Sequence, residues 1–402
     1  MAITSSVDGA PELRLTKTVE LTLFALCVAQ AVLLLASFAH GLWLLAPDGS
    51  GKDTDFVNVW AAGQLVRDGH PAAAYDWTLH KAAQNAALGR AFNGYYPWFY
   101  PPPFLLVASV VAMVPYAPAF AAWLAITLPA YAFTIRAIIG HRLGLMLACA
   151  FPGVVMNAVA GQNGYVSAAL IGGALHLMDR RPALAGALIG LLTYKPHFGV
   201  LFPLVLAVTG RWRVFASAAI VTVLVAALSY TAFGTETWQA FIGSLSVVSN
   251  VALTQESHFR KIHSVFALVR ALGGGEGLAW ALHGTVMAAT ALYVSLLWRS
   301  RAPFDLKAAA LAVGVLLVTP YVFIYDFVIL AVPMAFLVHA ARTGGFLPGE
   351  VTGLALASML IVLFLGVMAP FGLAAAAIVA ALIVRRVHVT GALTANAAVK
   401  PA

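Results

Sequence analysis

The sequence predicts an all-α membrane protein, a single bundle of about 12 transmembrane helices, and three observations support this fold class. Of the 402 residues, 62% are hydrophobic and only 9% are charged, whereas soluble domains carry roughly 25% charged residues. The mean hydropathy is +0.91. The apolar runs are long and continuous, whereas the strands of a membrane barrel alternate over about ten residues. No soluble fold buries this much apolar surface.

The distribution of charge separates membrane orientation from nucleic-acid binding. The formal net charge is +8, but the basic residues fall in pairs at the ends of apolar runs and form no basic patch, so we expect no nucleic-acid partner. This spacing is typical of the charges that orient membrane helices. Cys27 and Cys149 both lie inside apolar runs, so we interpret them as packing residues without a disulfide.

The first apolar run, residues 18–46, is longer than the core of a signal peptide and predicts a retained first span. Arg14 and Lys17 precede it, which favours a cytoplasmic N-terminal tail over residues 1–17. We expect one transmembrane domain over residues 18–386 and a cytoplasmic C-terminal tail over residues 387–402.

A long outer loop, residues 47–117, follows the first span. It predicts two short helices at residues 58–68 and 78–92, both lying flat at the membrane interface. Residues 95–104 are dense in aromatic residues and proline, which is typical of the lipid headgroup level. The apolar run 105–114 is too short for a span, which needs about 20 residues, and predicts a short dipping helix.

Charge decides how many further spans follow. With residues 105–114 counted as a short helix, 15 of the 23 Lys and Arg residues face the cytoplasm, as the positive-inside rule requires. Counting that run as a full span would place most arginine pairs outside. Together with the first span, the predicted spans are 118–139, 143–159, 164–178, 183–194, 198–209, 212–233, 278–298, 305–319, 321–341, 352–367 and 370–386. A second outer loop covers residues 234–277 and carries His258, Arg260, Lys261 and His263.

Two of these spans are unusually short, namely 183–194 and 198–209. Each would be about 18 Å long, against a hydrocarbon core of about 30 Å. They meet at Tyr194-Lys195-Pro196-His197, which would therefore lie below the outer surface. A polar backbone broken by proline is tolerated at that depth only where it lines a cavity that is enclosed by protein or filled with water. The same argument applies at Thr319-Pro320-Tyr321.

The unusual polar motifs converge on the outer side in this topology. Asp55 follows the first span, Gly161-Gln162-Asn163-Gly164 joins two spans, and Tyr194-Lys195-Pro196-His197 joins two others. Tyr325-Asp326 lies just inside the span 321–341. None of these motifs entered the assignment of the topology, so their common side predicts an outward-facing site.

Each of these residues also has a structural interpretation. Asp55 could cap a helix, Gln162 and Asn163 could do the same, and Lys195 could extend to the interface. His197 is expected to be a packing histidine. A carboxylate at Asp326 costs about 2.5–3.5 kcal/mol at mid-span on insertion scales, so it could pair with Lys195 structurally. No spacing of His, Cys, Asp or Glu predicts a metal site, and we expect no cofactor.

The ordered set of motifs resembles glycosyltransferase family 87. In the first outer loop the resemblance rests on Asp55-Phe56, Ala61-Ala62, Gly69-His70-Pro71 and Tyr75-Asp76. The later motifs are Tyr100-Pro101-Pro102-Pro103, Gly161-Gln162-Asn163 and Tyr194-Lys195-Pro196, and the similarity extends over about residues 20–340. The resemblance implies a GT-C-type bundle with its site on the extracytoplasmic face of a bacterial inner membrane, and a polyprenyl-phosphate-mannose-dependent α-mannosyltransferase. It also implies that Asp55 is the catalytic acidic residue. Family members can carry histidine where this chain has Tyr325-Asp326, which bears on the donor sugar.

The functional hypothesis is transfer of a hexose from a polyprenyl-phosphate-sugar lipid to an envelope glycan or glycolipid, with inversion and with Asp55 as general base. Lys195, Arg260 and His258 are candidates for the donor phosphate. Two alternatives remain open: a transporter or lipid-linked-glycan flippase, which broken short spans also suit, and a polymerase or ligase that uses lipid diphosphates. The expected substrate-binding residues are Tyr100, Gln162, Asn163, Tyr194, His197, Tyr325 and Asp326.

Overall fold

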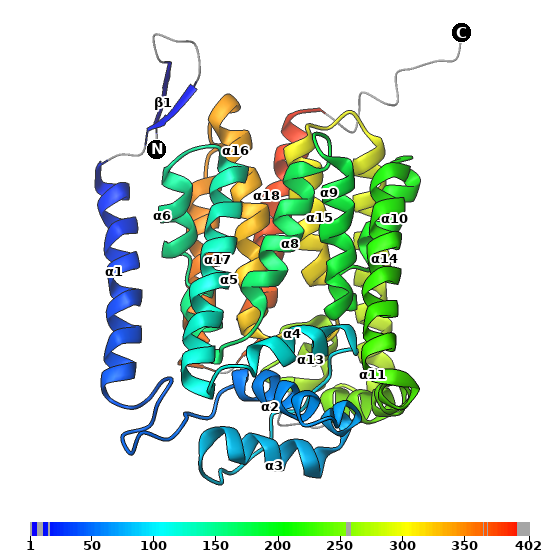
Figure 1. Cartoon of the computed structure of the whole chain (residues 1–402). Helices are drawn as coiled ribbons and strands as arrows, with labels where there is room; N and C mark the ends of the chain where they lie inside the picture. The colour runs from blue at the N-terminus through cyan, green and yellow to red at the C-terminus, as the bar shows by residue number, and fades with distance from the viewer. Residues whose placement is uncertain are drawn as a thin grey trace.

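The computed structural model describes residues 2–5, 11–14, 17–254, 259–364, 366–367 and 369–391. Within these ranges the chain forms helices joined by loops, and the strands belong to one short hairpin before the first long helix (Figure 1). The hairpin pairs β1 (Ala2–Ser5) with β2 (Pro11–Arg14) in antiparallel register, with Ala2 opposite Arg14. The sequence did not predict this pairing inside the polar N-terminal tail.

Long and short helices run roughly side by side and form the body of the molecule (Figure 1). They are α1 (Lys17–Ala39), α5 (Tyr116–Ile139), α6 (Leu143–Ala150), α7 (Gly153–Ala160), α8 (Gly164–Leu177), α9 (Pro182–Leu191), α10 (Leu201–Val208), α11 (Trp212–Thr254), α14 (Glu276–Arg299), α15 (Phe304–Leu317), α16 (Ala331–Gly344), α17 (Glu350–Leu363) and α18 (Phe371–Val389).

The bundle has two chemically different ends. At one end, which we call the basic end, arginines lie in the last turns of helices and bind neighbouring elements. Arg342 donates to the carbonyl oxygen of Ile139, and Arg386 forms a buried ion pair with Glu350 at 2.7 Å. The beginning of α1 and the end of α18 both lie at this end (Figure 1). The sequence-based topology assigned these arginines to one side of the membrane, and the structure gathers them at one end of the bundle.

The opposite end, the loop end, is covered by short helices that run across the bundle (Figure 1). These are α2 (Phe56–Arg67), η1 (Pro71–Tyr75), α3 (Trp77–Leu88), α4 (Pro103–Val111) and α13 (Val265–Ala271). Helices α2 and α3 match the two interfacial helices predicted at residues 58–68 and 78–92. Helix α4 has nine residues and spans about 14 Å, too short to cross a bilayer core of about 30 Å.

Every predicted span contains a helix, but not every one of these helices is long enough to cross a membrane by itself. Among the described residues, six helices are long and apolar enough to cross a membrane, or seven if α6 and α7 act as one bent span. The bend between α6 and α7 is 60°. Helices α8, α9, α10 and α17 are apolar but shorter. A polytopic membrane protein fits this arrangement, and the count of 12 crossings stays a prediction.

Two breaks in the bundle bring irregular backbone together. After α9 the chain forms η2 (Leu192–Tyr194) and η3 (Pro196–Phe198) before α10 begins. After α15 it turns at Pro320 and forms η4 (Ile324–Leu330) before α16. Both breaks coincide with the proline motifs expected to line an enclosed site. The largest buried apolar cluster of the protein surrounds η4, α8, α15 and α16.

Candidate active site

A buried ion pair joins the two helix breaks. The Lys195 Nζ atom lies 2.7 Å from Asp326 Oδ1, and both side chains are less than a tenth exposed. Pro196 disfavours helical backbone at the residue before it, and Lys195 accordingly has φ −132° and ψ 73°. Asp326 Oδ2 accepts from the backbone N–H of Phe323 at 3.3 Å. The structure therefore realises the pairing that the sequence offered as a structural interpretation.

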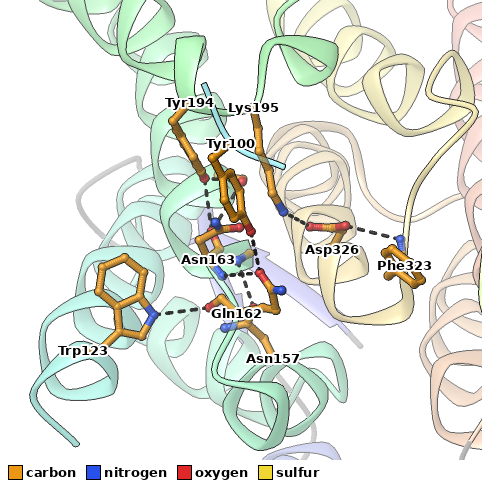
Figure 2. A network of polar contacts seen from close by, with 11 residues as sticks. Tyr100, Trp123, Asn157, Gln162, Asn163, Tyr194, Lys195, Phe323 and Asp326 are labelled. Atoms are coloured by element: carbon orange, nitrogen blue, oxygen red, sulfur yellow. Dashed lines mark hydrogen bonds and ion pairs between the residues drawn. The ribbon is translucent and has the colours of Figure 1, made fainter. Parts of the chain in front are cut away.

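The turn after α7 supplies the next polar group (Figure 2). Gly161 ends α7 in the left-handed region, with φ 68°, so the chain turns sharply and presents Gln162. The Tyr100 hydroxyl donates to Gln162 Oε1 at 3.0 Å, and the Trp123 indole donates to the Gln162 carbonyl oxygen at 3.4 Å. Gln162 is 4% exposed. Gln162 therefore belongs to an interior hydrogen-bond network, and helix capping alone does not account for its contacts.

Tyr194 and Asn163 lie in the same network (Figure 2). The Tyr194 hydroxyl lies 2.6 Å from Ser167 Oγ and 3.2 Å from the Asn163 carbonyl oxygen. Asn157 Oδ1 accepts from the backbone N–H of Gly164 at 2.9 Å, which fixes the start of α8. The aromatic ring of Tyr194 is stacked on Phe104 with ring centroids 4.9 Å apart, so α4 from the loop end packs directly on the network.

The backbone on both sides of Asp55 is fixed by its neighbours. The Tyr116 hydroxyl donates to the Lys52 carbonyl oxygen at 2.8 Å, and the Tyr96 hydroxyl donates to the Asp53 carbonyl oxygen at 3.3 Å. Phe56 is fully buried and stacked on Phe120 at 4.7 Å. Asp55 occupies the N-cap position of α2, but its side chain makes no capping hydrogen bond. The helix-cap interpretation therefore does not account for this carboxylate.

The environment of Asp55 changes its acidity. Burial raises the pKa of the Asp55 carboxyl to about 7, even though part of its side chain still reaches the surface. A side-chain hydrogen bond with Gln162 and the positive charges of Lys195 and Lys261 act in the opposite direction, while Asp326 adds to the increase. Asp55, Gln162, Lys195 and Asp326 thus lie within electrostatic reach of one another, as the convergence of motifs predicted. A pKa near neutrality suits a general acid or base.

The segment just before α13 contributes Lys261. Ile262 pairs with Phe323 in an isolated antiparallel bridge, and the His263 N–H donates to the Val322 carbonyl oxygen at 2.8 Å. This pairing fixes the segment beside η4, and the charge of Lys261 reaches Asp55. Arg260, a predicted phosphate ligand, is exposed next to Lys261. The charge that lowers the pKa of Asp55 from this segment is that of Lys261. His258, the other candidate, lies outside the described residues.

The other two predicted substrate residues border the pair. Tyr325 is partly exposed, and its ring centroid lies 5.6 Å from Lys195 Nζ. His197 is partly buried, and its ring packs against Phe198 at 4.4 Å, consistent with the packing role expected for it. The Tyr321 ring lies at a centroid distance of 6.4 Å from Phe99, which connects the segment before η4 to the aromatic segment 95–104.

Sequence reasoning missed several residues that hold the site. Trp123, Ser167 and Asn157 are interior partners of the network, and Asn157 was detectable as a polar residue inside an apolar run. Lys261 was visible as one of two adjacent basic residues, but nothing in the sequence favours it over Arg260. Among the described residues no cluster of three or more His, Cys, Asp and Glu side chains that could hold a metal ion was found.

Comparison with known proteins gives one family and no individual relative. No curated protein and no solved structure matches the chain. The family match contains Tyr100, Gln162, Asn163, Tyr194 and Lys195, and it is narrower than the range expected from the motifs, because it starts after Asp55 and ends before Asp326. Since residues 98–320 match the model of glycosyltransferase family 87 and make up more than half of the chain, the protein belongs to this family of membrane glycosyltransferases.

Proposed function

We propose that the protein transfers a hexose, with mannose the first candidate, from a polyprenyl-phosphate-sugar lipid to a hydroxyl group of an envelope glycan or glycolipid. The reaction takes place at the loop end, on the extracytoplasmic face of a bacterial inner membrane. The observation that supports it best is Asp55, a carboxylate with a pKa of about 7 that is hydrogen-bonded to Gln162 and lies within electrostatic reach of Lys195 and Lys261.

The proposed reaction is a direct displacement at the anomeric carbon. The acceptor oxygen forms a bond to that carbon while the bond from the carbon to the phosphate oxygen breaks, so the configuration inverts. Asp55 takes the proton from the acceptor hydroxyl, and the lipid phosphate leaves with the bonding electrons. General base catalysis of this type contributes typically 10²–10⁴-fold to the rate.

The cations of the site favour departure of the lipid phosphate. Lys195 already neutralises Asp326, but its ammonium group has three donors, so it can also hold a phosphate oxygen. Lys261 is exposed, and no hydrogen bond of its side chain is found among the described residues. Its positive charge lowers the pKa of Asp55. We assign Lys261 a share in phosphate binding with Lys195, ahead of Arg260. Cations near a leaving group act most strongly in a site that excludes water.

The donor lipid requires a site that opens to the bilayer. The segment 95–104 brings Trp98 and Tyr100 into the core of the loop end, where both are less than a tenth exposed. Phe104 is buried with them, whereas Tyr95, Tyr96 and Phe99 are partly exposed. The ring of Phe99 lies at a centroid distance of 6.4 Å from Tyr321, just before η4. Aromatic side chains of this kind are typical of the level of lipid headgroups, and their faces can stack on sugar rings. This segment is the proposed wall between the reacting centre and the lipid.

The experiment is Asp55→Asn, assayed by transfer of labelled hexose from polyprenyl-phosphate-hexose in detergent. We expect a loss of 10²–10⁴-fold in rate with normal expression and thermal stability, because the amide keeps the shape of the side chain but cannot accept the proton. The matched control is Asp53→Asn, two residues away. Its carboxylate pairs with Arg90 at 2.6 Å near the surface, where such pairs contribute about 0–1 kcal/mol.

Either of two outcomes would contradict the proposal. An Asp55→Asn variant that retains most of its rate would remove Asp55 as the base. A wild-type protein that moves labelled lipid across vesicles but forms no product in detergent would be a transporter. Comparison of monophosphate and diphosphate donors distinguishes the proposed enzyme from a polymerase or ligase, because the proposed enzyme uses the monophosphate.

A further inference from the structure

A cavity lies at the loop end, away from the pair formed by Lys195 and Asp326. Its volume is about 1030 Å³, and it lies between η1 with its flanking residues and the outer part of α11. Gly234 has φ 73° and ψ 178°, which breaks α11 so that the chain after it continues as a separate helix. We propose that this cavity binds the oligosaccharide part of the acceptor, an inference that rests on the proposed function.

The charge of the cavity selects a neutral or cationic ligand over a phosphate. Asp76, Glu236 and His70 contribute ionisable groups, and no lysine or arginine occurs among the described residues that line it. Asp76 uses Oδ1 to cap α3, accepting from the N–H groups of Thr78 and Leu79 at 2.9 Å each. Its second oxygen and the exposed Glu236 carboxylate remain as acceptors. Carboxylates form strong hydrogen bonds with hydroxyl donors, whereas they repel the donor phosphate.

Aromatic rings supply the apolar part of the cavity. Trp77 is 41% exposed, and its ring lies at a centroid distance of 5.1 Å from Tyr95. Tyr75 and Phe233 line the cavity with it. An aromatic ring gives a rigid, flat surface of low conformational entropy, on which the C–H face of a sugar can pack while its hydroxyls reach the carboxylates. Few polar groups converging on aromatic walls are typical of ligand pockets, which measure about 300–1,000 Å³.

The cavity is physically connected to the reacting centre. The Tyr75 hydroxyl donates to the Tyr100 carbonyl oxygen at 2.9 Å, and the Tyr100 hydroxyl donates to Gln162 at 3.0 Å. Asp55 precedes the first residue of α2, whereas Val66 near its end lines the cavity. A helix of 12 residues is about 18 Å long. An acceptor that reaches Asp55 from the cavity must therefore be longer than a single hexose.

The first test is direct binding to the full-length protein in detergent, with mannotetraose and maltotetraose as probes in calorimetry. We expect at least one of them to bind the wild type and to bind the Trp77→Ala and Glu236→Gln variants about tenfold more weakly. Trp77→Ala removes a ring on which the sugar packs, and Glu236→Gln removes the charge from an acceptor of its hydroxyls. The matched control is Trp212→Ala. Trp212 is 61% exposed at the basic end, and its removal should leave binding unchanged. The inference is wrong if neither probe binds, or if Trp77→Ala and Glu236→Gln bind as the wild type does.

The second test uses acceptor length. Trp77→Ala should raise KM for a tetrasaccharide acceptor about tenfold and leave transfer to a monosaccharide glycoside unchanged, because the short acceptor does not reach the cavity. An equal loss with both acceptors would show a general structural defect and overturn the inference. This result is separable from failure of the proposed function, which would show itself as an active Asp55→Asn enzyme whatever the cavity binds.

Discussion

At the scale of single residues, the site is a balance between burial and charge. Asp55 lies in surroundings that oppose its ionisation, and the nearest cations, Lys195 and Lys261, oppose that effect only in part. An ordinary surface aspartate has a pKa of about 3.9 and is a weak base. The surroundings of Asp55 bring its pKa to about 7, where a carboxylate is about half ionised at neutral pH and more basic than an ordinary aspartate.

This balance predicts a pH profile. The base is active when deprotonated, so kcat/KM should fall about tenfold per pH unit below pH 7 and level off above it, because kcat/KM reports the free enzyme. Lys261→Ala removes a charge that lowers the pKa of Asp55, so its profile should shift to higher pH. Rates measured from pH 5 to 9 test both statements. A wild-type profile that is flat from pH 5 to 8 would show that Asp55 titrates as an exposed aspartate does.

The buried pair of Lys195 and Asp326 predicts a difference between single and double variants. Lys195→Ala leaves Asp326 buried without its partner, which costs about 3–5 kcal/mol of stability. Replacing both, as Lys195→Met with Asp326→Leu, should restore the stability, since apolar substitutes for buried pairs are often neutral or better. Thermal unfolding in detergent measures this difference.

Transfer activity then separates structure from function at the pair. The stable double variant should still lose donor use, seen as a raised KM for polyprenyl-phosphate-hexose, because no ammonium group remains at that position. Full activity in the double variant would mean that the pair only holds the two helix breaks together. The phosphate would then depend on Lys261 alone.

Sequence alone predicted the central residues of the site but not all of their contacts. Asp55, Gln162, Lys195 and Asp326 were each conspicuous as polar residues at the ends of apolar runs, and charge placed them on one side. The contacts of Trp123 and Ser167 were not predictable, because an indole or a hydroxyl inside an apolar helix is compatible with many partners. The choice of Lys261 over Arg260 depends on the bridge between Ile262 and Phe323, which is a tertiary contact without a local signal.

At the scale of elements, Gly161 shows how a turn positions the site. Gly161 and Gly89 both end helices in the left-handed region, with φ 68° and 69°. A Cβ atom at Gly161 would lie 2.6 Å from Phe120 and Phe56, whereas at Gly89 it would meet nothing within 4 Å. The two positions share the backbone strain and differ in the surrounding space.

Alanine substitution at these two glycines is therefore a matched pair. Gly89→Ala should cost only the backbone strain, about 1–2 kcal/mol. Gly161→Ala should cost more and should also reduce transfer, because Phe56 follows Asp55 and Gln162 follows Gly161. Thermal unfolding and transfer rates of both variants test this comparison. Equal stability and activity in the two variants would mean that the packing around Gly161 does not control the site.

Helix positions were more predictable than helix shapes. Apolar periodicity and charge located α2, α3 and all the long helices, because each depends on local sequence. The 60° bend between α6 and α7 and the continuation of α11 beyond Gly234 depend on packing and on one glycine conformation. The hairpin of β1 and β2 was missed because a polar tail carries no alternation strong enough to indicate strands.

At the scale of the whole molecule, α1 is set apart from the bundle. It contains no buried residue and stands beside the other helices (Figure 1). It contacts α6 through a hydrogen bond from Gln30 Nε2 to the Cys149 carbonyl oxygen at 3.0 Å. An apolar cavity of about 530 Å³ separates α1 from α5, α16 and α17. A helix with such a surface is stable only in lipid, which agrees with a membrane protein.

The orientation in the membrane can be tested across a single helix. Helix α14 runs from Glu276 at the loop end to Arg299 at the basic end, and its 24 residues extend about 36 Å, enough to cross a core of about 30 Å. Glu276 and Arg301 are both exposed. In a variant without Cys27 and Cys149, Glu276→Cys should react with an impermeant maleimide in intact spheroplasts. Arg301→Cys should react only after permeabilisation, because arginine-rich ends remain in the cytoplasm. The reverse pattern would place Asp55 on the cytoplasmic side, and the proposed transfer to an envelope acceptor would then be impossible at this site.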